Sequence, residues 1–231
     1  MPSAPGKHFD SILQAVRDQT HALLGRTISY SPEAWAASTR LQGWTRSHVA
    51  AHLIKGARSL AQVCRELLAG SSGSHYDSGL GRDCELLAIT DGLHLQIELD
   101  TSAGELDPLL TQLAGREGHV QLRPGLKVAI RDLPLVRLRE LALHSFDLEP
   151  DASSLEVTDE VAAPLLAFET TYLARGTGSL DIETTREQVL HIDGPNPPRR
   201  LVGPAPALLT WLARGIELEE LQSSPVEPGQ G

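Results

Sequence analysis

The chain has 231 residues, enough for one large domain or for a medium domain followed by a small one. Its formal net charge of -10 argues against nonspecific binding to nucleic acid or to an anionic membrane, because phosphates attract basic surfaces. No apolar run approaches the roughly 20 residues that span a bilayer, and the first ten residues lack a signal-peptide core. We therefore expect a cytoplasmic protein without nucleic-acid or membrane partners.

The first half of the sequence predicts helices. Aromatic residues make up only 4% of the chain, so a core of Leu, Ala, Val and Ile is expected, and this favours helices over packed sheets. Residues 91–106 also alternate in a way that suits a strand, but the run is long and helix is favoured. The predicted helices cover residues 9–24, a short segment after Ser31, residues 45–68, residues 91–106 and residues 135–148.

The second half of the sequence predicts a change from long helices to a mixture of helices and strands. We expect Asp107-Pro108 to break or restart a helix, and residues 115–127 to form a polar connection rich in glycine. After a boundary near residues 149–151 the pattern predicts a helix over 159–175, a hairpin around 180–182 and 189–192, a third strand at 200–202 and a helix over 206–214. The predicted domains are therefore a four-helix unit over 1–150, a small α+β unit over 151–222 and a disordered tail over 223–231.

Glu140 and His144 are the residues that most strongly suggest chemistry. Their spacing places a carboxylate and an imidazole on one helical face, one turn apart, and His52 lies on another predicted helix. Two imidazole nitrogens and one carboxylate oxygen are a common set of protein ligands for catalytic zinc. The alternatives for Glu140 are an ion pair with Arg137 or Arg139, or a place on the solvent face. The alternative for His52 is a packed core histidine.

The two cysteines suggest no site of their own. Cys64 and Cys84 are too far apart for a CxxC motif and too few for a disulfide framework. Cys64 stands in an apolar helical segment and is expected to pack as a small hydrophobic residue. His48 near the start of the second long helix is expected to serve a capping or surface role.

Three segments together resemble the mycothiol-dependent maleylpyruvate isomerases. Gly43-Trp44-Thr45 followed by His52 is similar to the GWT…H signature of that family. Residues 138–148 resemble its RxREVWxHxxDL helix, and residues 202–214 are similar to its C-terminal G…LL.WL.GR segment. The resemblance rests on the occurrence of all three segments, in the same order, over nearly the whole chain.

The resemblance implies a fold and a set of site residues. The fold would be mainly α within the α+β class, a DinB-like four-helix bundle followed by a small C-terminal α+β domain. The zinc ligands would fall on His52, Glu140 and His144. The substrate-binding, catalytic arginines would fall on Arg82 and Arg214, for each of which the alternative is a solvated surface charge.

The implied activity is the cis–trans isomerisation of maleylpyruvate to fumarylpyruvate in gentisate degradation. Rotation requires the conjugated cis double bond to become single for a time, which reversible addition of a thiolate achieves. Zinc with an open fourth position would hold the thiol as its reactive thiolate. The small thiol would be mycothiol, with ergothioneine and glutathione left open, and the arginines would bind the carboxylates of the dicarboxylate substrate or the enolate formed on addition.

Two other functions stay open at this point. A thiol S-transferase or another detoxification enzyme of the same fold would keep the metal but have a more apolar pocket. A noncatalytic metal-binding module would close the metal site with a fourth protein ligand, for which His48, His94 and Cys84 are candidates. The sequence carries no sign of the oligomeric state.

Overall fold

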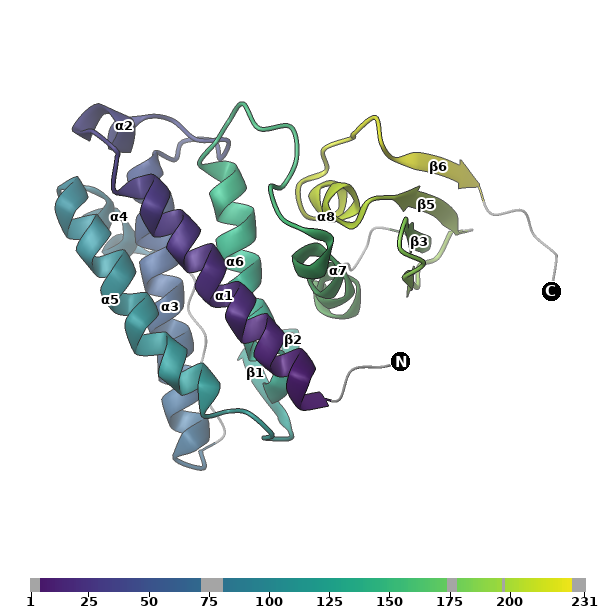
Figure 1. Cartoon of the computed structure of the whole chain (residues 1–231), viewed down its shortest axis with the longest axis horizontal. Coiled ribbons are helices and arrows are strands. Elements are labelled where there is room, and N and C mark those ends of the chain that lie inside the picture. The colour runs from purple at the N-terminus through teal and green to yellow at the C-terminus, as the bar shows by residue number, and fades with distance from the viewer. Residues whose placement is uncertain (1–4, 72–80, 174–177, 197, 226–231) are drawn as a thin grey trace. The chain divides into compact units, whose positions relative to one another are not determined.

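The computed structural model describes residues 5–71, 81–173, 178–196 and 198–225. Its internal contacts divide the chain into two compact units, Met1–Asp151 and Ala152–Gly231. The first unit is mainly helical, and the second combines helices with a small sheet (Figure 1). The expected fold class, a helical bundle followed by a small α+β unit, is confirmed.

Four long helices build the first unit: α1 (Pro5–Thr27), α3 (Arg46–Leu68), α5 (Gly92–Thr111) and α6 (Leu133–Asp147). Helices α1 and α3 each pack against both α5 and α6, so the four helices surround one core. The apolar stripes that predicted the helices supply this core. Its buried side chains include Leu13, Val16, Leu53, Leu60, Leu95, Leu99, Leu138 and Leu141.

Short helices also belong to this unit. Ser31 caps helix α2 (Pro32–Ala36) as expected, because its hydroxyl accepts a hydrogen bond from the amide of Ala34. Helix α4 (Arg82–Ala88) packs on α3, where Cys84 and Ala88 lie against Ala51. A short 3-10 helix, Ile130–Asp132, leads into α6.

The predicted helix break at Asp107-Pro108 is wrong, because Pro108 lies inside α5. The helix continues because Leu106 and Leu110 on either side of the proline are both buried in the core. Asp107 also accepts a hydrogen bond from Arg17 of α1 at 2.7 Å. Packing and this ion pair together outweigh the hydrogen bond that proline removes.

The predicted polar connection over residues 115–127 is also wrong. It contains β1 (His119–Arg123), which pairs antiparallel with β2 (Leu126–Ala129). Side chains of β1 alternate between exposed and buried, with Val120 and Leu122 facing inward. Gly125 forms the turn with a φ of 79°, a conformation that favours glycine.

In the second unit, α7 (Asp159–Phe168) continues as a π-helix over Glu169–Leu173, and α8 spans Ala205–Arg214. The sequence placed the end of the first helix at residue 175, and residues 174–177 lie outside the described part of the chain. The final helix is confirmed, with its expected Pro206 in the first turn.

The sheet of this unit has the strand order β4-β3-β5-β6. The expected hairpin is formed by β3 (Leu180–Thr184) and β4 (Val189–Ile192), and the expected third strand is β5 (Arg199–Gly203), parallel to β3. The tail predicted from residue 223 is wrong at its start, because β6 (Gln222–Pro225) pairs with β5. Residues 226–231 lie outside the described part of the chain.

Candidate functional site

The start of α3 fixes the position of His52. The amide of Thr45 donates to Nδ1 of His48 at 3.2 Å, and the Thr45 hydroxyl lies 2.7 Å from the same nitrogen, which caps the helix. His52 follows one turn after His48, on the same helical face. Its ring packs edge-on against Trp44, with centroids 5.6 Å apart. The GWT segment therefore both begins the helix and packs against its histidine.

Helix α6 brings His144 to His52. The two imidazole rings meet edge to face, with centroids 4.6 Å apart. They come from helices that are 92 positions apart in the sequence but pack against each other. Two imidazoles in contact on facing helices are the arrangement from which bundle proteins build metal sites.

Glu140 lies one turn before His144 and is only 7% exposed. Its Oε2 is 3.2 Å from Nη1 of Arg137, so the ion pair that the sequence left open as an alternative does form. Its carboxylate points at α3, because a Cβ built on Gly56 would lie 2.7 Å from the same Oε2. Gly56 stands one turn after His52, so the carboxylate lies beside the next turn of the same helix.

His144 has a second polar partner in Asp147, which is fully buried. Nδ1 of His144 lies 2.9 Å from Oδ2 of this carboxylate. Because an ionised carboxylate only accepts hydrogen bonds, this contact favours the tautomer in which Nδ1 carries the proton and Nε2 can act as an acceptor. Metal-binding histidines usually have such a partner. Asp147 was not among the residues predicted for the site, although its spacing of three residues from His144 on a helix is a signal that the sequence contains.

The three expected ligands fit zinc in chemistry, but they are not gathered around one point. Within the ranges that the structure describes, no group of three or more His, Cys, Asp and Glu side chains is placed to hold a metal ion. The donor set is that of catalytic zinc, His144 has a carboxylate partner, and the missing side chain at position 56 leaves space for the carboxylate of Glu140. The residues present therefore fit the metal that the sequence predicts.

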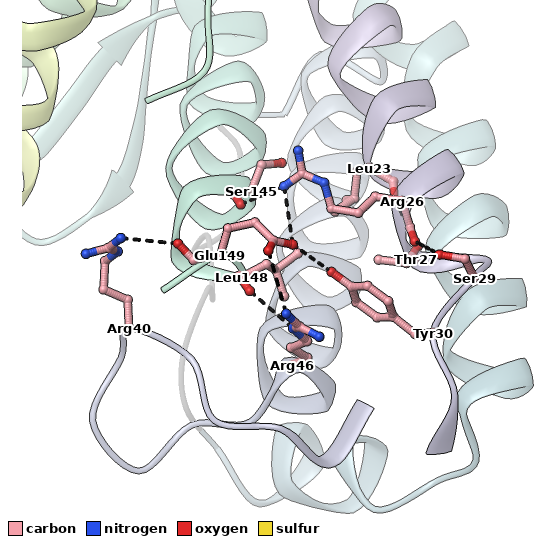
Figure 2. A network of polar contacts seen from close by, with 10 residues as sticks. All are labelled: Leu23, Arg26, Thr27, Ser29, Tyr30, Arg40, Arg46, Ser145, Leu148 and Glu149. Atoms are coloured by element: carbon pink, nitrogen blue, oxygen red, sulfur yellow. Dashed lines mark hydrogen bonds and ion pairs between the residues drawn. The ribbon is translucent and has the colours of Figure 1, made fainter. Parts of the chain in front are cut away.

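The end of α6 is held by arginines around one carboxylate (Figure 2). Glu149 accepts a hydrogen bond from the Tyr30 hydroxyl at 3.2 Å and lies 3.8 Å from Arg26 and 3.7 Å from Arg46. Burial raises the pKa of Tyr30, so its hydroxyl stays a donor. Nothing in the sequence pattern predicted this network, because its members come from separate segments.

Three arginines also satisfy backbone carbonyls at this helix end. Arg26 donates to the carbonyl of Ser145 at 3.1 Å, and Arg46 donates to that of Leu148 at 3.1 Å (Figure 2). The amide of Arg40 donates to the carbonyl of Asp147, also at 3.1 Å. Positive charge at a helix C-terminus is favourable, and the last carbonyls need partners. The turn that carries His144 and Asp147 is therefore firmly placed.

The two candidate arginines lie in different units. Arg82 is the first residue of α4, and its side chain is exposed. The same short helix is joined to α3 by Glu85, whose carboxylate lies 3.3 Å from Nε2 of His48. Arg214 ends α8 in the second unit and is half-buried. The roles of both arginines stay predictions.

The cysteines and the remaining histidines do not complete a metal site in the described part of the chain. Burial raises the pKa of Cys64 to about 12 and also raises that of Cys84, so both thiols stay protonated near neutral pH. His48 is used in the helix cap, and His94 is an exposed residue near the start of α5. Among the helices that the structure describes, none is both long and apolar enough to cross a membrane.

Comparison with known proteins identifies the family. Residues 16–149 match the family described as the mycothiol maleylpyruvate isomerase N-terminal domain. The chain also resembles a crystal structure of the mycothiol-dependent maleylpyruvate isomerase, with a TM-score of 0.75 and 18% identity over 94% of this chain and 92% of that one. A histidine-to-alanine mutant of that enzyme matches with the same TM-score and coverage at 17% identity.

The solved structures share the fold at low identity, whereas the family match covers more than half of the sequence. No curated protein sequence matches the chain significantly. The matched segment contains His52, Glu140 and His144. This chain belongs to the family of the mycothiol maleylpyruvate isomerase N-terminal domain.

Proposed function

We propose that this protein is a zinc- and thiol-dependent isomerase that converts maleylpyruvate to fumarylpyruvate in gentisate degradation. The observation that carries the proposal is the contact between the rings of His52 and His144, whose centroids are 4.6 Å apart on facing helices. Membership of the family and the likeness in fold to a mycothiol-dependent maleylpyruvate isomerase support the same reaction.

The metal would be held by His52, Glu140 and His144. Bound zinc would supply an open coordination position at which a thiol loses its proton. Asp147 would hold the proton of His144 on Nδ1, so that Nε2 would be left to bind the metal. Two neutral imidazoles and one carboxylate leave the centre with a net positive charge, and this favours binding of a thiolate.

The thiol must come from outside the chain, because both cysteines are buried with raised pKa values. Mycothiol is the thiol that the family name suggests, with ergothioneine and glutathione as alternatives. Bound thiol would supply the reversible addition that lets the cis double bond rotate. Arg82 and Arg214 would bind the carboxylates of the substrate or the enolate formed on addition, since guanidinium groups pair with carboxylates in a bidentate way.

The test is a metal analysis followed by an isomerisation assay. Purified protein is expected to carry one zinc ion per chain and to isomerise maleylpyruvate when mycothiol is added. The variants His52→Ala, Glu140→Ala and His144→Ala should each lose metal and activity. Full activity in any of them, or in metal-free protein with thiol present, would disprove the site.

The exposed side chain of Arg82 favours a second candidate, a thiol S-transferase that needs no clamp for a dicarboxylate. The two functions differ in what the arginines do. An isomerase should lose maleylpyruvate turnover in Arg82→Gln and Arg214→Gln while it keeps zinc. A transferase should instead join mycothiol to an apolar electrophile such as monobromobimane, with no loss in either variant.

A further inference from the structure

We infer that Arg137 is a positioning residue for the metal site, which together with Gly56 holds the carboxylate of Glu140 in place for the metal. The inference rests on the proposed function and adds two residues to it. Arg137, Gly56 and the carbonyl of Leu53 are called the Glu140 cradle below.

Arg137 links the two helices that carry the candidate ligands. Its side chain is buried, with a residue exposure of 1%. A single nitrogen, Nη1, donates to the backbone carbonyl of Leu53 at 2.9 Å and to Oε2 of Glu140 at 3.2 Å. Leu53 directly follows His52 on α3, so one guanidinium nitrogen connects the backbone beside His52 with the carboxylate on α6.

Gly56 forms another wall of the cradle. A Cβ at this position would lie 2.7 Å from Oε2 and 2.8 Å from Oε1 of Glu140, closer than real Cβ contacts. The glycine is in the middle of a helix, where it is less favourable than alanine by roughly 1 kcal/mol. Its presence is explained by the space that the carboxylate occupies.

Stability alone is a weak reason for this ion pair. Replacing a buried ion pair by apolar side chains of similar volume is often neutral or stabilising, because removing two charges from water is costly. Orientation of a metal ligand is a better reason for the Arg137–Glu140 pair, since the hydrogen-bond partners of metal-binding carboxylates commonly contribute about 10–100-fold to metal affinity. The positive charge of Arg137 opposes a cation, and we expect the loss of orientation to outweigh the relief of that repulsion.

The first experiment measures the zinc affinity of the full chain by competition with a chelating dye. Arg137→Gln is expected to bind zinc roughly 10–100-fold more weakly than the parent protein. The matched control, Arg58→Gln, removes an arginine from an exposed pair with Glu98 on α3 and α5, and its zinc affinity should not change. Equal zinc affinity in a folded Arg137→Gln variant would overturn the inference.

A double-mutant cycle separates positioning from general support of the fold. If Arg137 acts through Glu140, adding Arg137→Gln to Glu140→Gln should weaken zinc binding by clearly less than it does in the parent protein. A merely structural arginine would weaken zinc binding by the same factor in both backgrounds, and that result would contradict the inference.

Two further variants keep the test decisive if Arg137→Gln does not fold. Gly56→Ala leaves the arginine in place, and the crowded carboxylate should reduce zinc affinity without a change in the circular dichroism of the helices. Arg137 also lines a cavity of about 250 Å³ between α1 and α5, together with Val16 and Leu110. Ethylguanidinium should therefore reach the gap in Arg137→Ala and restore part of the zinc affinity.

The outcomes distinguish the inference from the proposed function. If the parent protein binds no zinc, the proposed function fails first and the inference fails with it. If the parent protein binds zinc, and neither Gly56→Ala nor a folded Arg137 variant lowers the affinity for zinc, only the inference fails. Weaker zinc binding in both, with rescue by ethylguanidinium, is the result that the cradle predicts.

Discussion

The bundle and the C-terminal unit differ in how deeply their ion pairs are buried, although the C-terminal unit also buries one carboxylate, that of Glu169. In the bundle the Arg137–Glu140 pair is almost fully buried, and Asp147 is buried beside His144. In the C-terminal unit His191 lies 2.6 Å from Asp181, and Arg186 lies 2.7 Å from Asp159, with the histidine and arginine side chains 51% and 65% exposed. Pairs in water contribute little, whereas buried pairs are costly to break.

The difference suggests which charges serve the chemistry. Burying a charge is costly, so a buried charge suggests a functional role for its geometry. In the bundle, buried Arg137 contacts Glu140 and buried Asp147 contacts His144, and both partners are candidate metal ligands. Of these two surface pairs, His191–Asp181 lies between strands β4 and β3, and Arg186–Asp159 joins the β3–β4 turn to α7. Substitutions in buried and in exposed pairs separate these two kinds of charge.

The largest effect is expected from Glu140→Ala in the metal-free chain. The variant leaves the guanidinium of Arg137 buried without its carboxylate, and this should reduce the free energy of unfolding by about 3–5 kcal/mol. The matched variant in the second unit, Glu183→Ala, removes a surface partner of Arg200 and should change it by about 0–1 kcal/mol. Denaturant unfolding measures both, and equal effects would erase the contrast between the two units.

Asp147→Asn is expected to have an intermediate effect. An amide in place of the carboxylate no longer accepts strongly from Nδ1 of His144, which should reduce stability by about 1–3 kcal/mol. It should also weaken zinc binding by roughly 10–100-fold, because the imidazole loses the group that orients it. Thermal melts and dye competition on the same samples measure the two effects, and wild-type zinc affinity would contradict this role of Asp147.

Elements that result from local sequence patterns could be predicted, and elements that depend on contacts between distant segments could not. The long helices follow from apolar periodicity, and the sheet of the second unit from its alternating β3 and β4. The continuation of α5 through Pro108 depends on Arg17 from another helix. The β1–β2 hairpin depends on the buried side chains of Val120 and Leu122, which stand in a segment of mainly polar composition. Such tertiary causes do not appear in a local pattern.

The candidate site shows the same limit. Spacing and resemblance selected His52, Glu140 and His144, and two of the three side chains do come into ring contact. The role of Gly56 could not be predicted, because a glycine within a helix gives no sign of the carboxylate that faces it from α6. The arginines around Glu149 were missed for the same reason, since Arg26 and Arg46 come from two separate helices, α1 and α3 (Figure 2).

The smallest effect is expected from the surface histidine of the C-terminal unit. The hydrogen bond from His191 to Asp181 raises the pKa of the imidazole in the folded state. The folded state therefore binds this proton more tightly, so the stabilisation is present below the unfolded pKa near 6.5 and is lost as pH rises through the folded pKa. The melting temperature of His191→Gln should be lower than that of the parent protein at pH 5–6 and should approach it above the folded pKa. A gap that is independent of pH would contradict this.

The most direct test of the central claim is zinc X-ray absorption spectroscopy on the full chain, before and after addition of mycothiol. The account predicts a centre with nitrogen and oxygen ligands near 2.0–2.2 Å from His52, Glu140 and His144, which gains one sulfur ligand at about 2.3 Å when the thiol binds. A centre that already contains protein sulfur, or one that shows no sulfur ligand with saturating mycothiol, would contradict it.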